Sequence, residues 1–304
     1  MQDLKPLFPY HGGKWRLAPK IVPLLPPHIV YTEPFCGCAA VYWKKGRPTH
    51  EMTNYREALN DRNGDLATVY SVVKDPTKMQ AVMTRLAGVP YSRGVYETDR
   101  HYQEGDDDVS RTYRFLLRTC MAFSSVTGSR LSGWGYGANG PQLPLEWSRY
   151  KTRVQGLIDK YAARIDATFL DSKDAIPFME AWDQVGTCHY VDPPYVDTSQ
   201  HGYDGYTVDN YRRLLEFLGD AKGSVVLSGY PNEYVSTSWP YVDFAHSTSA
   251  APGTMRTGTT ERIERLWILD RSGDITPEIW KRIKTAYAGW RSLPGVNEQA
   301  TLFA

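Results

Sequence analysis

Four consecutive residues, Asp192, Pro193, Pro194 and Tyr195, have the types needed to activate an aromatic amine. The exocyclic amine of a nucleobase is a poor nucleophile because its lone pair is delocalised into the ring, and acceptors on its two N–H bonds would localise that pair. Asp192 offers a carboxylate oxygen, and Pro193 offers a backbone carbonyl on a chain that the two prolines stiffen. Tyr195 can stack on a base that has left its duplex. The same residues could also form a rigid turn with a solvated carboxylate.

Three further motifs in the N-terminal third could hold a nucleotide-like ligand. A strand predicted at residues 29–31 runs into a turn of small residues, whose backbone can approach a ligand closely and whose following helix start offers free N–H groups. A loop before it combines an aromatic residue, two glycines and a cation. An acid follows the turn at the separation, about 20–30 residues, typical of a ribose-binding carboxylate. The residues are Tyr10, Gly12, Gly13 and Lys14 in the loop, Glu33, Pro34, Phe35 and Gly37 in the turn, and the acid Asp61.

In this order, the patterns Tyr-x-Gly-Gly-Lys, Glu-Pro-Phe-x-Gly, Asn-Asp-x-Asn and Asp-Pro-Pro-Tyr resemble those of the Dam-type DNA adenine-N6 methyltransferase family, over residues 6–270. The resemblance implies an α/β fold with a Rossmann-like methyltransferase sheet, S-adenosylmethionine as the methyl donor and double-stranded DNA as the substrate. It implies direct transfer of the methyl group to the N6 amine of a flipped-out adenine, without a metal or a covalent enzyme intermediate. The catalytic residues would be Asp192, Pro193, Pro194 and Tyr195. The cofactor-binding residues would be Tyr10, Gly12, Gly13, Lys14, Glu33, Pro34, Phe35, Gly37, Asp61, Asp174 and Asp192.

Some positions depart from the family pattern. The family places an acid for the cofactor's adenine at Asp174, but Asp171 competes for this role, and Ala175 stands where an aromatic residue is usual. Cys38 and Ala39 replace the small serine or glycine residues of the cofactor turn. Both are small enough to leave a tight turn intact, so we expect cofactor binding to survive.

The resemblance divides the chain into a discontinuous catalytic domain, residues 1–72 and 166–271, and an inserted, mainly helical target-recognition domain, residues 73–165. From Arg111 to Arg164 the chain has nine Lys and Arg residues and two acids, an electrostatic pattern that indicates contact with DNA phosphates. A solvated face beside a flexible loop would look the same. The acids at residues 106–108 predict a solvated helix N-terminus. The expected DNA-binding residues are Arg118, Ser124, Arg130, Trp134, Tyr136 and Arg149.

The last residues, 272–304, predict an amphipathic helix over 275–290 and then a flexible tail. Within the tail, Gln299, Leu302 and Phe303 resemble the Gln-x-x-Leu-Phe peptide with which bacterial proteins bind the replication sliding clamp. Leu302 and Phe303 would fill an apolar pocket. A frayed terminus is the alternative.

Composition excludes several other classes of protein. A chain of 304 residues with 41% hydrophobic residues can bury a sizeable core, and a net charge of +1 argues against a protein that coats nucleic acid indiscriminately. We expect a cytoplasmic protein without a membrane span, because the apolar runs are short and the N-terminus lacks a secretory signal. Cys36, Cys38, Cys120 and Cys188 are too scattered for a disulfide framework or a zinc site.

Three other functions compete with methylation of adenine as explanations of these motifs. Methylation of the cytosine N4 amine needs the same chemistry, and the shape of the pocket decides between the two bases. A non-catalytic DNA-binding decoy would have no need to keep Asp192, Tyr195 and Lys14. A nicotinamide dehydrogenase would need a G-x-G-x-x-G turn, which Cys38 and Ala39 disfavour.

Overall fold

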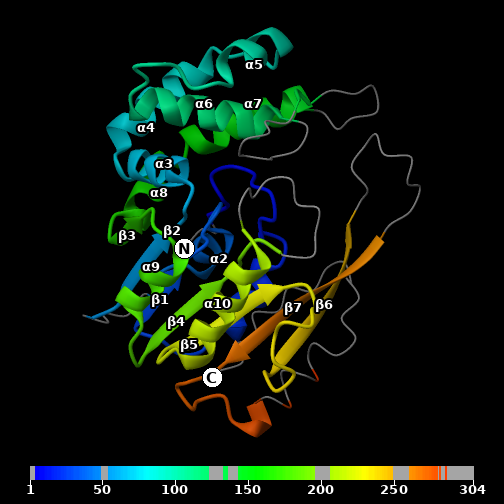
Figure 1. Ribbon diagram of the computed structural model, residues 1–304. Coiled ribbons are helices and arrows are strands. Elements are labelled where there is room, and N and C mark those ends of the chain that lie inside the picture. The colour runs from blue at the N-terminus through cyan, green and yellow to red at the C-terminus, as the bar shows by residue number, and fades with distance from the viewer. Residues whose placement is uncertain are drawn as a thin grey trace.

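The computed structural model describes residues 4–48, 54–122, 133–135, 143–195, 206–248 and 260–279, together with residues 281 and 285 (Figure 1). The helices are α1 (Ala18–Ile21), the 3₁₀ helix η1 (Val22–Leu24), α2 (Ala40–Lys45), α3 (Gly64–Lys74), α4 (Pro76–Ala87), α5 (Arg93–Asp99), α6 (Asp108–Met121), α7 (Leu143–Gln155), α8 (Ile158–Ile165), α9 (Ala175–Trp182) and α10 (Val208–Asp220). The strands are β1 (Val30–Glu33), β2 (Arg56–Asn60), β3 (Thr168–Asp171), β4 (Thr187–Val191), β5 (Ser224–Gly229), β6 (Tyr241–Thr248) and β7 (Thr260–Leu269).

The seven strands form one sheet in the order β3-β2-β1-β4-β5-β7-β6. The first five strands are parallel, and β7 runs antiparallel to both of its neighbours. Every residue of β1, β4 and β5 is buried, as expected for parallel strands that are covered on both faces. The sequential order of the strands reverses between β1 and β4, which is where open α/β sheets bind their ligands. The predicted Rossmann-like sheet is confirmed.

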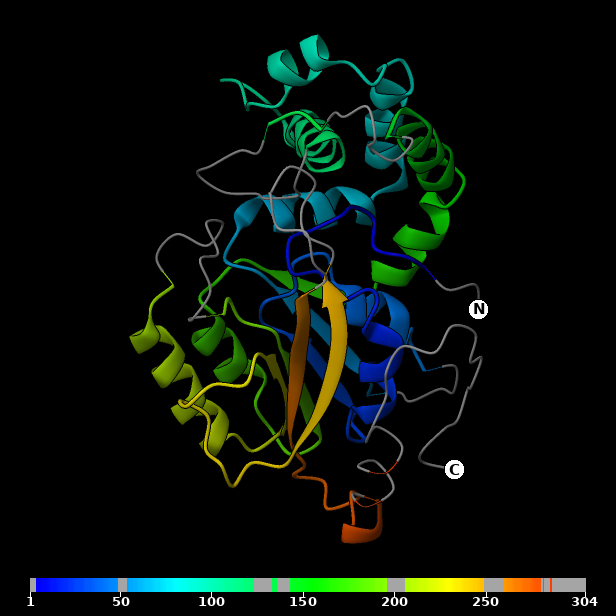
Figure 2. The same cartoon turned by 90° about the vertical axis from the view of Figure 1, so that its right-hand side faces the viewer.

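Helices cover both faces of the sheet (Figure 2). Helices α9 and α10 pack on one face through an apolar cluster that includes Phe178, Leu214 and Leu218. Helix α10 begins with a reciprocal Thr207–Asn210 capping box, and its residues Tyr211, Leu214, Leu215 and Leu218 are buried at helical spacing. The opposite face of the sheet is covered by α1, α2 and the helices that follow β2.

The segment between β2 and β3 is helical, as predicted, and its helices α4 to α7 lie above the sheet in Figure 1. Phe115 and Leu116 of α6 belong to the same apolar cluster as Tyr31 of β1, so the inserted helices share a core with the sheet. The predicted boundary after residue 72 falls inside α3, whereas the boundary after residue 165 coincides with the end of α8. Asp107 accepts a hydrogen bond from the backbone N–H of Ser110 and thus caps α6, which agrees with the predicted helix start.

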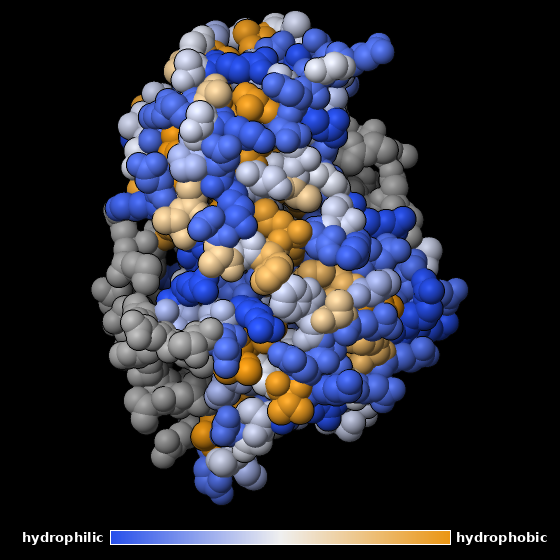
Figure 3. All heavy atoms as spheres, turned by 90° about the vertical axis from the view of Figure 1, so that its left-hand side faces the viewer, coloured by the Kyte–Doolittle hydropathy of each residue, from blue (hydrophilic) through white to orange (hydrophobic). Residues whose placement is uncertain are grey.

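One edge of the sheet is the four-residue strand β3, on the side of the molecule that faces the reader in Figure 3. Apolar side chains gather near the middle of this otherwise hydrophilic face. Phe169 of β3 is 57% exposed and packs edge-on against Trp182 of α9. An edge strand this short offers few unpaired backbone groups to another chain.

The predicted C-terminal helix is described only at residues 277–279, 281 and 285, which are helical. Gln299, Leu302 and Phe303 lie outside the described residues. No helix in the described part of the chain is both long enough and apolar enough to cross a bilayer.

Candidate active site

The predicted site residues converge because β2, β1 and β4 are adjacent parallel strands. Glu33 ends β1, Asp61 follows the last residue of β2, and Asp192 follows the last residue of β4. Parallel strands bring their carboxyl ends to one edge of a sheet, so these three acids approach one another although they are far apart in sequence.

The carboxylate of Asp192 lies in a buried group of polar side chains. Lys14 Nζ lies 2.8 Å from Asp192 Oδ1 and 2.9 Å from Oδ2, and the hydroxyl of Tyr195 donates to Oδ1 at 3.1 Å. The same hydroxyl, which has only one proton to donate, also contacts Oε1 of Glu264 on β7, and that oxygen accepts a bond of 2.7 Å from Ser228 Oγ. Lys14 Nζ is 3.6 Å from the same Glu264 oxygen. Two carboxylates therefore share one ammonium group.

The charges of this group are set by burial and by one another. Burial would lower the pKa of Lys14, but Asp192 and Glu264 outweigh it, so the pKa is raised and Lys14 is charged. Burial raises the pKa of Asp192; Lys14 opposes this rise and Glu264 reinforces it, leaving the pKa above its ordinary value. Asp192 is therefore a more basic acceptor than an aspartate in water.

The cofactor turn after β1 has the close-packed backbone that its small residues predict. Gly37 has φ of 49°, and a Cβ there would lie 3.0 Å from Cδ1 of Tyr10. Its N–H donates to Oδ2 of Asp61 at 3.0 Å, so the predicted ribose acid also supports the turn. Burial raises the pKa of Asp61 to about 6, although the N–H donors of Asn63 and Gly37 act to lower it. The loop that contains Gly13 packs directly on this turn, because a Cβ at Gly13 would lie 2.9 Å from Cys38 Sγ.

We expect Gly37→Ala to weaken binding of S-adenosylmethionine about tenfold. A side chain at this left-handed position costs about 1–3 kcal/mol and displaces Tyr10 from the turn, and tenfold in affinity corresponds to about 1.4 kcal/mol. Isothermal titration calorimetry would measure the change. Gly88→Ala is the matched control, because Gly88 has φ of −79° and its Cβ would meet nothing within 4 Å. Equal affinities of the two variants would show that the turn does not shape the cofactor site.

Glu33, Pro34 and Phe35 stabilise the turn through contacts with other parts of the protein. Glu33 is 2% exposed and accepts a 2.7 Å hydrogen bond from the hydroxyl of Tyr31, and burial raises its pKa to about 8. The carbonyl of Pro34 accepts from the side chain of Asn60 at 2.9 Å, and Phe35 packs edge-on against Tyr206. The carboxyl of Glu33 thus bonds within the protein and holds the strand end in place.

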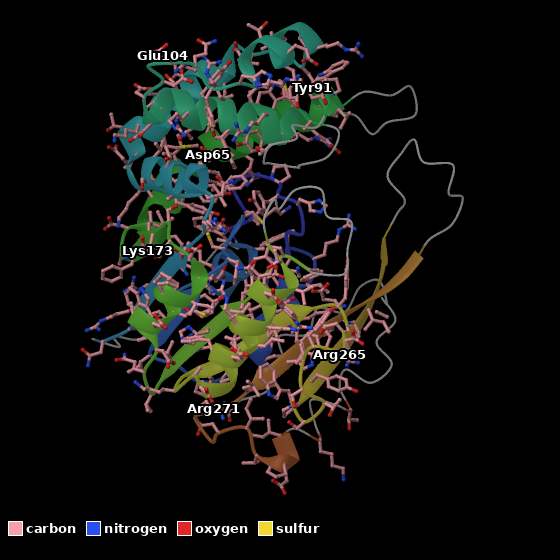
Figure 4. All side chains as sticks on the ribbon, in the orientation of Figure 1. Asp65, Tyr91, Glu104, Lys173, Arg265 and Arg271 are labelled. Carbon is pink, nitrogen blue, oxygen red and sulfur yellow. The ribbon has the colours of Figure 1, made fainter. Side chains whose placement is uncertain are left out.

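The two acids considered for the cofactor's adenine lie just after β3. Asp174 is at the N-cap of α9, with its side chain 71% exposed and 3.5 Å from Arg62. Asp171 is less exposed and lies 2.9 Å from Lys173, which Figure 4 labels. The side chain of Asn60 bonds to both the N–H and the carbonyl of Lys173, so it joins this turn to the cofactor turn. Asp174 remains accessible to a ligand at the strand ends.

Arg118, one of the predicted DNA-binding residues, is occupied by contacts within the protein. Arg118 is 7% exposed, and its guanidinium donates to Asp65 at 2.6 Å and to the hydroxyl of Tyr102 at 2.7 Å. Asp65 lies among the inserted helices in Figure 4 and also accepts from Arg111 at 3.0 Å. Arg118 thus joins α6 to α3, because a buried cation needs a fixed counter-charge.

The positive charge counted from residue 111 to 164 is also partly internal. Arg114 pairs with Asp106 at 2.8 Å, and Arg164 pairs with Glu57 at 2.5 Å. Together with Arg111 and Arg118, which share Asp65, four of the nine cations are paired with acids outside that segment. The excess charge is therefore a weaker indication of a DNA-binding surface than the sequence count implied.

Of the other predicted DNA-binding residues, Arg149 is exposed on α7. Trp134 pairs with Ala122 in an antiparallel bridge, and its ring lies 5.4 Å from that of Tyr91, which is labelled in Figure 4. Ser124, Arg130 and Tyr136 lie outside the described residues.

Sequence motifs did not identify Glu264, Ser228 or Tyr230 as site residues. Ser228 and Glu264 bond to each other between β5 and β7, and Tyr230 packs edge-on against Tyr195 at 4.7 Å. The sequence carries no signal that singles out Glu264, because this residue stands among charged residues of β7. Its burial, with only 3% of the residue exposed, is what shows that it needs a partner.

Similarity to known proteins agrees with this geometry. The model of the D12 class N6 adenine-specific DNA methyltransferase family matches residues 10–222. The DNA adenine methylase of Escherichia coli (strain K12) is 21% identical over 294 residues, which cover 91% of this chain and 99% of that protein. The DNA N-6-adenine-methyltransferase of Escherichia phage P1 is 25% identical over 74% of this chain and 30% of the phage protein. The chain belongs to the D12 class N6 adenine-specific DNA methyltransferase family.

Proposed function

We propose that this chain transfers a methyl group from S-adenosylmethionine directly to the N6 amine of an adenine flipped out of double-stranded DNA. The observation that carries the proposal is the half-buried carboxylate of Asp192, which is paired with Lys14, follows β4 and is the strand-end neighbour of the cofactor turn after β1. A methyl donor at the turn and an amine at Asp192 would meet at the switch point of the sheet.

The residues of the turn fit the proposed cofactor. Gly37 leaves no side chain between the backbone and a ligand, and Asp61 has lone pairs beyond those that accept from Gly37 and Asn63. Tyr10 and Gly13 pack on this turn, Gly12 lies between them with open space around its Cα, and Asp174 is exposed beside the turn. When bound, S-adenosylmethionine supplies an electrophilic methyl group on a sulfonium.

The chain's own residues would activate and orient the base. Asp192 accepts one N–H of the amine, the carbonyl of Pro193 accepts the other, and Tyr195 faces the base with its ring. Lone-pair density on N6 is thereby directed toward the methyl group. As the bond from N6 to the methyl carbon forms, the bond from that carbon to the sulfonium sulfur breaks, the thioether product leaves, and N6 loses its extra proton to water. Holding two reactants in line accounts for most of the expected rate gain.

The DNA would contact the inserted helices. Arg149 and Trp134 are the described candidates, and Ser124, Arg130 and Tyr136 remain predictions of the same kind. Since its proposed substrate is DNA, we place the protein in the cytoplasm.

The direct test is to incubate the protein with S-adenosylmethionine and unmethylated DNA, digest the DNA and identify the nucleosides by mass spectrometry. N6-methyl-2′-deoxyadenosine is the expected product. N4-methylcytosine would keep the mechanism and change the substrate. If the protein binds the cofactor but modifies no base in DNA of varied sequence, the catalytic proposal fails and a DNA-binding decoy becomes the better description.

We also propose that the tail residues Gln299, Leu302 and Phe303 recruit the protein to a bacterial sliding clamp. The support is the Gln-x-x-Leu-Phe pattern, in which two large apolar side chains would carry most of the binding free energy. Leu302→Ala combined with Phe303→Ala is expected to abolish retention of the protein on immobilised clamp. A matched Asn297→Ala variant should be retained like the wild type. Equal retention of the double variant and the wild type would end the proposal.

A further inference from the structure

Glu264 is a buried carboxylate next to the catalytic tetrapeptide that the proposed chemistry does not use. It lies on β7, its side chain is 4% exposed, and its Oε1 contacts the hydroxyl of Tyr195 and accepts a hydrogen bond from Ser228. β7 pairs with β5 on one side and β6 on the other, so the position of Glu264 is fixed by the sheet. A rigidly held charge beside the reacting group calls for an explanation.

The contacts between Lys14 and Asp192 explain why a second carboxylate is needed here. Lys14 lies within 2.9 Å of both oxygens of Asp192, and the hydroxyl of Tyr195 already donates to one of them. A carboxylate has about four acceptor positions and Lys14 takes one on each oxygen, so an adenine amine that also donates to Asp192 competes with Lys14 for its negative charge. A buried ammonium that loses its counter-charge is strongly destabilised, so the lysine needs a second acceptor nearby.

Glu264 fits this requirement by distance and by charge. Its Oε1 is already 3.6 Å from Lys14 Nζ, so a small rotation of the lysine would bring the two into hydrogen-bond contact. The ammonium would stay buried and paired throughout. Ser228, which donates to the same oxygen at 2.7 Å, keeps the carboxylate from turning away.

We propose that Glu264 is a positioning residue that takes over the ammonium of Lys14 when the amine of the target adenine binds to Asp192. The inference rests on the proposed function, because it assigns Asp192 to the amine. Glu264 touches neither substrate nor cofactor in this scheme. It acts through Lys14, and it also holds the hydroxyl of Tyr195 so that the ring keeps its place.

The test is Glu264→Gln, which keeps the size of the side chain and an oxygen for Tyr195 and Ser228 but removes the charge. We expect the single-turnover rate of methyl transfer to fall about 10–100-fold, the range seen when a group that orients a functional side chain is changed. The melting temperature and the affinity for S-adenosylmethionine should stay as in the wild type. Asp243→Asn is the matched control: Asp243 pairs with Arg265 on the same sheet, away from Asp192, and its replacement should leave the rate unchanged.

Two further measurements separate this role from simple structural support. In a Lys14→Met background no ammonium needs a new partner, so Glu264→Gln should cost less than about twofold there, whereas a structural role would cost the same in both backgrounds. In addition, Glu264 raises the pKa of Asp192, so the acid side of the rate–pH profile should move to lower pH in Glu264→Gln.

The outcomes distinguish this inference from the function on which it rests. Suppose that the wild type methylates N6 of adenine. The role of Glu264 is then disproved if Glu264→Gln keeps the full rate, or if it loses the same factor in both backgrounds and its pH profile does not move. In either case the proposed function stands. If the wild type forms no methylated adenine, both are overturned.

Discussion

Asp192→Ala is expected to reduce methyl transfer by at least about 10²–10³-fold, while the affinity for S-adenosylmethionine changes only a few-fold. The carboxylate is the acceptor that would direct the lone pair of the adenine amine, and removal of one aligned hydrogen-bonding group from a transition state has a cost of this size. Single-turnover assays with labelled cofactor measure the rate, and calorimetry measures the affinity. A loss of cofactor affinity that matches the loss of rate would instead assign Asp192 to the cofactor site.

Asp192→Asn distinguishes loss of the acceptor from damage to the site. Asparagine has the size of aspartate, so the fold and the melting temperature should be kept, but its neutral oxygen is a weaker acceptor and cannot neutralise Lys14. Its rate should therefore be low as well. If Asp192→Asn were as fast as the wild type, the charge of Asp192 would have no part in catalysis.

The wild-type rate should also fall on the acid side of its pH profile. Burial raises the pKa of Asp192 above its ordinary value of 3.8, and the protonated carboxyl loses the charge that makes it a strong acceptor. The rate of methyl transfer should therefore be maximal well above this pKa and should fall as the pH drops through it. A rate that stays constant to below pH 4 would contradict this assignment.

The parts of the site that the sequence predicted are those with short-range patterns. The Asp192 tetrapeptide and the turn at Gly37 each lie directly after a buried apolar strand, and parallel pairing then brings such strand ends together. Family resemblance supplied the order of these motifs along the chain. The fold class and adenine as the target base of the family are confirmed.

The parts that the sequence did not predict depend on contacts between distant residues. Glu264 meets Tyr195 across 69 positions, and Arg118 meets Asp65 across 53. A local count of charges cannot tell a cation that faces DNA from one that pairs with a distant acid, as Arg118 does with Asp65. Long-range ion pairs are set by the topology of the sheet and of its covering helices.

Glu57→Ala is expected to lower the free energy of unfolding by about 3–5 kcal/mol, the largest effect on stability that we predict, because it leaves two buried cations without their counter-charge. Glu57 on β2 is fully buried, and its oxygens lie 2.9 Å from Lys45 Nζ and 2.5 Å from an Arg164 nitrogen. Lys45 and Arg164 are themselves less than 10% exposed. Urea denaturation at neutral pH would measure the loss. Arg212→Ala breaks an ion pair whose partners are at least 60% exposed, and it should change the stability little.

The loss caused by Glu57→Ala should also depend on pH. Burial alone would raise the pKa of Glu57, but Lys45 and Arg164 outweigh it and hold the pKa below the ordinary value of 4.5. A depressed pKa in the folded state means that the charged form stabilises the protein fully above pH 4.5, and that this contribution is lost as the pH falls through the folded-state pKa. The difference in stability between wild type and Glu57→Ala should therefore be constant near neutrality and become smaller in acid. A difference that stayed constant down to the acid transition would show that Glu57 contributes packing alone, because packing does not titrate.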